Sequence, residues 1–172
     1  SAVSINNGTG IFFGSEDGFI YGVDQNGNAL AGWPKDTGSN VVGSIAFSDL
    51  DNDGSPEVIS TNEEGSILAY HLDGTDVMYF PITGDFSYTS SPQILDFDGD
   101  NDLELFAGST LGVEVFDVKT EGDSEGYWST HRSNQSRTGY IELSGSSCTT
   151  ADVNSDGIVD ILDIVQAINI AM

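Results

Sequence analysis

Basic residues are scarce in this sequence, and their scarcity excludes whole classes of partner. The 172 residues contain 4 Lys and Arg against 28 Asp and Glu, which gives a formal net charge of −24. Because affinity for DNA and RNA comes from neutralising phosphates with basic side chains, four scattered ones cannot form a binding face. We therefore expect no nucleic-acid partner and no binding to an anionic membrane surface.

Long apolar runs and cysteines are also few. No stretch approaches the ~18 apolar residues of a membrane-spanning helix, and residues 1–4 (SAVS) have neither the basic nor the apolar part of a secretory signal. We expect that a targeting segment was removed or that the chain is a piece of a longer precursor. The single cysteine, Cys148, excludes an internal disulfide framework and a Cys-rich zinc site. It leaves open a free surface thiol or a bridge to another chain.

The sequence does contain an internal repeat of 47 residues. Residues 18–24 (GFIYGVD) align with residues 65–71 (GSILAYH), and this register continues from about residue 10 to residue 128 without an insertion. Within a unit, short apolar runs between turn residues predict four strands, at 44–48, 57–60, 66–70 and 77–80. Four short antiparallel strands in about 47 residues are typical of a β-propeller blade.

The repeat predicts a mainly β fold with about three four-stranded, propeller-like blades over residues 1–140. We expect the first unit to be incomplete, because its acidic loop is reduced to Ala2, Ser4, Asn6 and Gly10. Propellers usually close with ~4 to 8 blades, so three blades leave open edges that can pair with another chain. The chain is therefore expected to be a fragment of a larger propeller, or a subunit that closes against neighbours.

Two acidic loops recur in the repeat, with the sequences DLDNDGSPE at residues 49–57 and DFDGDNDLE at residues 96–104. Alternating side chains of a tight loop can converge on one point, and a hard divalent cation with ~6 to 8 oxygen ligands makes such crowding tolerable. Without a cation the carboxylates would repel one another and their pKa values would rise. Calcium fits these loops better than magnesium, which keeps several waters, or zinc, which prefers His and Cys.

Together with the strand signal at residues 18–23 and the Trp33-Pro34 pair, these loops resemble the FG-GAP or VCBS repeat family, whose propeller repeats also occur in integrin α-subunits. The resemblance implies a calcium ion in a hairpin loop between the first two strands of a blade. Asn101 replaces a glycine of the pattern, because Asn tolerates the left-handed conformation. No metal is expected in the first unit. The implied ligands are Asp49, Asp51, Asp53, Ser55 (carbonyl) and Glu57, and Asp96, Asp98, Asp100, Asp102 (carbonyl) and Glu104.

Two other interpretations of the acidic loops are weaker. Asp, Asn and Gly form turns without any metal, but turn formation does not explain two matching loops in register. Paired carboxylates also catalyse glycoside hydrolysis, yet the spacing is that of a cation cage and no separate acid stands out. We expect no enzymatic activity.

The C-terminal part has a different composition. Residues 141–150 are expected to be a flexible linker, and residues 152–163 (DVNSDGIVDILD) fit an EF-hand calcium loop with its glycine at position 6. The segment 151–172 resembles one repeat of a dockerin domain, a half EF-hand, so we expect about three Ca²⁺ sites in all. Its ligands by the EF-hand pattern are Asp152, Asn154, Asp156, Ile158 (carbonyl), Asp160 and Asp163.

The end of the chain is predicted to be an apolar helix over residues 161–172. A short helix of this composition is unstable alone in water, so we expect it to dock in a groove of its own propeller or of another molecule. Its apolar stripe contains Ile161, Ile164, Val165, Ile168 and Met172.

Residues 127–140 hold two of the four basic residues. We interpret this segment as closing the last blade, with Arg132 and Arg137 paired to carboxylates. His131 has no accompanying Ser, Cys or second His, and neither His131 nor His71 is assigned any chemistry.

These features favour a secreted, non-catalytic, calcium-stabilised structural or adhesion module, extracellular or on the surface of a bacterial cell. We expect it to assemble with another chain or with copies of itself, through open blade edges and the C-terminal helix. One alternative is the attachment region of a larger secreted hydrolase. Another is a carbohydrate-binding propeller that uses Trp33, Trp128 and Tyr side chains.

Overall fold

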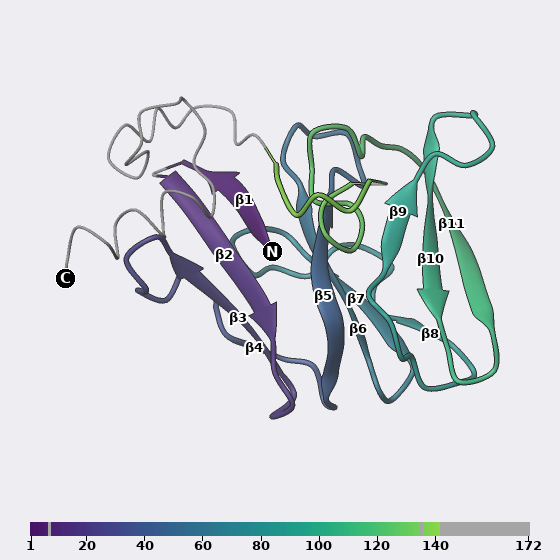
Figure 1. Cartoon of the computed structure of the whole chain (residues 1–172), viewed down its shortest axis with the longest axis horizontal. Coiled ribbons are helices and arrows are strands. Elements are labelled where there is room, and N and C mark those ends of the chain that lie inside the picture. The colour runs from purple at the N-terminus through teal and green to yellow at the C-terminus, as the bar shows by residue number, and fades with distance from the viewer. Residues whose placement is uncertain (7, 135, 142–172) are drawn as a thin grey trace.

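A computed structural model describes residues 1–6, 8–134 and 136–141 and contains three antiparallel sheets side by side (Figure 1). The predicted mainly β fold is confirmed, and the described residues contain no helix. The predicted helix and calcium loop of residues 151–172, and the linker from residue 142 on, lie outside these residues. The strands are β1 (Ala2–Ile5), β2 (Gly8–Gly14), β3 (Phe19–Asp24), β4 (Lys35–Asp36), β5 (Val41–Ser48), β6 (Glu57–Asn62), β7 (Ser66–Tyr70), β8 (Ile82–Thr83), β9 (Gln93–Leu95), β10 (Asp102–Gly108) and β11 (Val113–Glu121).

Each sheet corresponds to one repeat unit. The first sheet is β1-β2-β3-β4, the second β5-β6-β7-β8 and the third β9-β10-β11. The first unit is thus a full four-stranded sheet, and what it lacks is the acidic loop: Ile5 pairs with Gly8 in a tight hairpin. The predicted strand at 77–80 is wrong, because these residues turn, with Tyr79 at φ 71°, and the fourth strand begins after Pro81.

The third hairpin departs from the 47-residue register. Gly14 pairs with Ile20 and Thr61 with Ile67, but the equivalent Gly108 pairs with Val113. The connection is therefore one residue shorter in the third sheet, and a one-residue slip reverses the faces of the following strand.

Hydrophobic cores fill the two spaces between neighbouring sheets. Side chains alternate along a strand, so Val58 and Ile59 of β6 enter different cores, and β6 is buried along its whole length. Trp33 extends from the first sheet to the second, where its Nε1 donates to the Leu72 carbonyl at 2.9 Å. The first core contains Val3, Phe12, Ile20, Trp33, Val41, Ile45, Phe47, Val58, Leu68 and Tyr70. The second contains Ala46, Leu50, Ile59, Ile67, Ala69, Val77, Tyr88, Ile94, Leu103, Leu105 and Ala107.

The segment after β11 returns to the first strands of the second and third sheets. The amides of Phe47 (β5) and Ile94 (β9), 47 residues apart, donate to the consecutive carbonyls of Trp128 and Ser129, each at 2.9 Å. In the 47-residue register, residues 129–130 correspond to β8, which pairs with β7. The repeat therefore predicts that they pair with β11 at the edge of the third sheet. The segment therefore ties two sheets together rather than adding a fourth strand to the third. Among the described residues neither Arg132 nor Arg137 forms an ion pair.

No helix in the described part of the chain is long and apolar enough to cross a membrane.

Candidate metal sites

The first acidic loop connects β5 to β6 and is organised around Asp49. This side chain is 2% exposed. Its Oδ1 accepts the amide of Asp53 at 3.1 Å and its Oδ2 that of Gly54 at 2.8 Å. These bonds fold the loop back on its first residue. As a result, Asp49, Asp51 and Asp53 each offer a carboxylate oxygen within 4.8 Å of the others.

Glu57, expected as a ligand of the same site, has a different position. It is fully buried, and its Oε2 accepts the Leu50 amide at 2.7 Å. Its Oε1 lies 3.2 Å from Nδ1 of His71, which sequence reasoning had left without a role. Burial raises the pKa of Glu57 to about 7. The only available signal for His71 was its place in the hairpin, one residue beyond the pair of Val58 with Tyr70.

The second acidic loop, between β9 and β10, repeats this arrangement. Asp96 accepts the amides of Gly99 at 2.7 Å and Asn101 at 3.3 Å. Glu104 accepts the Phe97 amide at 2.6 Å, as Glu57 accepts that of Leu50. Two overlapping groups of carboxylates could each hold an ion here: Asp96, Asp98 and Glu104, and Asp100, Asp102 and Glu104.

The side chain of Asp102 belongs to the second loop's cluster, where the family pattern assigned only its carbonyl. Its Oδ1 is buried without a hydrogen-bond partner, and its Oδ2 lies 3.8 Å from Nζ of Lys119. The side chain of Asp100, which favours the protonated form of its neighbour, raises the pKa of Asp102 to about 6. Lys119, which also pairs with Asp117, was not anticipated as a neighbour of this loop.

Both loops use left-handed residues at the same two positions. Asn52 and Gly54 have φ of 58° and 88°, and their counterparts Gly99 and Asn101 have φ of 84° and 74°. Glycine and asparagine are thus exchanged between the loops with no change of backbone geometry. The predicted left-handed conformation of Asn101 is confirmed.

A cleft of about 990 Å³ lies between the first two sheets, beside the first acidic loop. It is lined on one side by residues near the tight β1–β2 hairpin, including Asn6 and Asp24, and on the other by Asp53, Glu57 and His71. The short hairpin of the first unit leaves this space where the second unit has its long loop.

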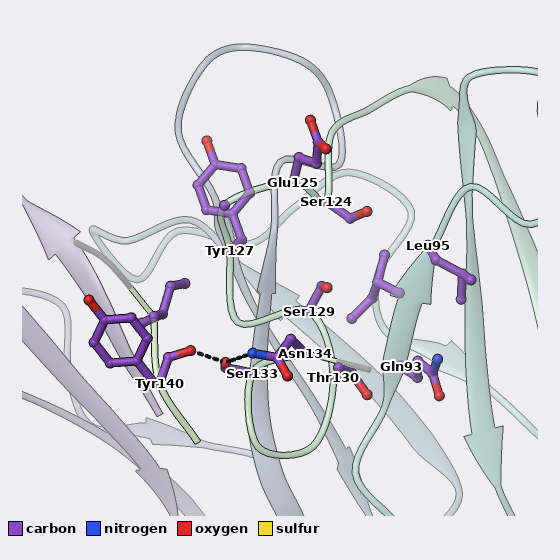
Figure 2. A pocket seen from close by; sticks show the side chains of 13 residues that line it. Gln93, Leu95, Ser124, Glu125, Tyr127, Ser129, Thr130, Ser133, Asn134 and Tyr140 are labelled. Carbon is purple, nitrogen blue, oxygen red and sulfur yellow. Dashed lines mark hydrogen bonds between the residues drawn. The ribbon is translucent and has the colours of Figure 1, made fainter. Parts of the chain in front are cut away.

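A second cleft, of about 290 Å³, lies between β9 and the segment that follows β11, from residue 124 to residue 141 (Figure 2). Its polar lining is mostly hydroxyl and amide groups, and Ser133 donates to the Tyr140 carbonyl across one end. His131 lies nearby in sequence and has Nδ1 3.4 Å from the Ser44 hydroxyl. Among the described residues none contacts the other nitrogen of this exposed ring, so the pair lacks the third member of a catalytic triad there.

Comparison with known proteins supports the repeat. A sequence model described as FG-GAP-like repeat matches residues 49–107, which include both acidic loops. Among solved structures, the chain is similar to the crystal structure of BamB from Moraxella catarrhalis, with 12% identity and a TM-score of 0.47. The match covers 76% of this chain and 34% of that one, so the chain spans about a third of BamB's length. No curated protein matches the chain.

Proposed function

We propose that this chain is a non-catalytic, calcium-binding module of the propeller type, which serves a structural or adhesive role. The observation that carries the proposal is the pair of acidic loops at the same place in two repeat units. In each, at least three carboxylates meet within 4.8 Å. Repulsion in such a group is relieved most directly by a divalent cation.

The donor set suits calcium. The grouped ligands are oxygen atoms alone, whereas zinc sites use His or Cys. In the second loop the buried Oδ1 of Asp102 has no hydrogen-bond partner, so this oxygen is available to coordinate a cation. Asp49 and Asp96 are already oriented by amides of their own loops. A bound Ca²⁺ would neutralise charge at these loops.

Calcium titration by calorimetry, with thermal unfolding in calcium, magnesium and chelator, tests the proposal. Extracellular modules bind calcium with Kd of about 10⁻⁴ to 10⁻³ M. At ten to a hundred times Kd each site should add about 1.4 to 2.7 kcal/mol to the free energy of unfolding. An unfolding midpoint that is equal in calcium and chelator would rule out the calcium proposal.

Two variants assign the sites. Asp51→Asn and Asp98→Asn each remove one exposed carboxylate from a different loop. Each should lower the number of bound ions by one or weaken one binding step at least tenfold. Asp85→Asn, an exposed acid outside both loops, is the control and should bind as the wild type does.

Weak calcium sites of this kind suit a compartment where calcium is constant and high, so we place the module outside the cell or on its surface. As partners we propose other protein surfaces, including copies of the chain itself. The net charge of −24 disfavours nucleic acids and anionic membrane surfaces as partners.

A further inference from the structure

The two terminal sheets each expose an apolar face. On the first sheet, Ile11, Phe13, Tyr21 and Val23 form what we call the leading face, in which Ile11 pairs with Val23, and the rings of Phe13 and Tyr21 stack at 5.3 Å. On the third sheet, Phe97, Phe106, Val113 and Val115 form the trailing face, where Phe97 packs on Phe106 at 5.5 Å.

These faces are unusually exposed for their composition. Phe13 is 46% exposed, Val115 51% and Phe97 70%. No sheet of the described residues covers either face. The returning segment 123–129 bonds to the first strands of two sheets and so does not take this place.

The two interfaces inside the chain show which faces fit together. At positions 47 residues apart, Phe12 and Ile59 each enter the core shared with the following sheet. Val58 and Leu105, also 47 residues apart, each enter the core shared with the preceding sheet. The same interface therefore occurs twice: the Phe12 position of one sheet meets the Val58 position of the next.

Continuing this rule identifies the occupant of each uncovered face. Phe106 is the third residue of the Phe12 and Ile59 series, and it has no following sheet among the described residues. Ile11 is the first residue of the Val58 and Leu105 series, and it has no preceding sheet there. The trailing face is thus the natural counterpart of the leading face, and in a single copy the two lie on opposite outer sheets (Figure 1).

We propose that two copies of this chain pack the trailing face of each on the leading face of the other, and so close a ring of six sheets. The number of copies follows from closure, because propellers close with ~4 to 8 blades and two copies supply six, whereas three would supply nine. A head-to-tail contact that closes also saturates both faces and stops growth. The inference rests on the propeller-type module proposed above.

Light scattering after size exclusion, in millimolar calcium and at physiological ionic strength, tests the proposal. The wild type should have twice the 18.2 kDa mass of the chain. Ile11→Glu and Val115→Glu, made separately, each place one charge in both contacts of the ring and should give the mass of one chain. Met78→Glu, at a turn residue that is 72% exposed and outside both faces, is the matched control and should remain a dimer.

A mixing experiment tests the pairing of the two faces. Ile11→Glu and Val115→Lys should each be a monomer alone. When mixed, they can form a dimer that has one native contact and one contact between opposite charges, so the doubled mass should return. Circular dichroism spectra like that of the wild type, with cooperative unfolding, exclude misfolding, because both positions are on the surface of the single chain.

The outcomes separate this inference from the calcium proposal. A wild type that binds calcium but has the mass of one chain, or of more than two, overturns the six-sheet ring and leaves the calcium module intact. A dimer that binds no calcium by calorimetry overturns the calcium proposal alone. Monomeric single variants that do not recover on mixing overturn the face-to-face pairing.

Discussion

Glu57, the first residue of β6, and His71, the residue after β7, are in contact, with Oε1 of the carboxylate 3.2 Å from Nδ1 of the ring. The second Glu57 oxygen accepts the amide of Leu50, inside the acidic loop. Glu57 therefore links the base of the first loop to the next strand. In the third sheet Asp117 pairs with Glu104. The buried glutamate of the first loop therefore faces an imidazole, and that of the second loop faces another carboxylate.

The first prediction concerns pH in calcium-free buffer. The pKa of Glu57 rises from 4.5 to about 7 because the carboxyl group is buried. Between these values the folded chain holds a proton at Glu57 that the unfolded chain has lost. The stability contributed by the protonated form is thus complete below pH 4.5 and is lost as pH rises through 7, by about 3 kcal/mol at most.

Urea unfolding of the wild type and Glu57→Gln across this range measures the effect. Gln keeps an acceptor for the Leu50 amide but does not titrate, so the free energy of unfolding of the wild type should fall relative to the variant as pH rises. The comparison removes the contribution of the other carboxylates. A constant difference from pH 4 to pH 8 would contradict the assignment.

The second prediction concerns Asn101, whose φ of 74° is left-handed. Asn101→Ala should lower the free energy of unfolding by about 1 kcal/mol, because a Cβ without a polar group disfavours this conformation. Asn101→Gly, as in the first loop, should be neutral or stabilising. Equal stabilities of the two variants by urea unfolding would contradict the argument.

The third prediction concerns the core between the second and third sheets. Ile59 is fully buried there, and Ile59→Ala should cost about 2 to 5 kcal/mol. Met78→Ala removes an exposed apolar side chain and should change the free energy of unfolding by less than about 0.5 kcal/mol. Thermal unfolding of both variants measures the difference. A cost below about 1 kcal/mol for Ile59→Ala would argue against the packed interface.

Much of the fold could be predicted from the sequence, because a repeat of 47 residues constrains each unit to the same set of strands. The left-handed Asn101 also followed, since a single position in a known loop geometry decides it. The one-residue slip at Val113 did not, because residues on both faces of β11 are apolar and the pattern fits either register.

The long-range contacts of the candidate sites were beyond sequence reasoning for a different reason. The pairing of Trp128 and Ser129 with β5 and β9 depends on where the chain travels after the last strand, which no local preference specifies. The contact of Glu57 with His71 required the strand register. Only the acidic residues that are close in sequence, such as Asp49, Asp51 and Asp53, could be grouped in advance.

The last prediction uses two glycines with the same backbone conformation. Gly27 and Gly32 both have φ of 84°, but an added Cβ meets nothing within 4 Å at Gly27 and overlaps the Asp73 carbonyl of the second sheet at Gly32. Gly27→Ala should therefore cost only the strain of a left-handed alanine, about 1 kcal/mol. Gly32→Ala adds a clash with backbone that cannot move without separating the first two sheets, and should cost about 1 to 3 kcal/mol more. Urea unfolding of the two variants isolates the contact of Gly32 with the backbone of Asp73 and Gly74. Equal losses in the free energy of unfolding would show that the first two sheets do not approach each other this closely.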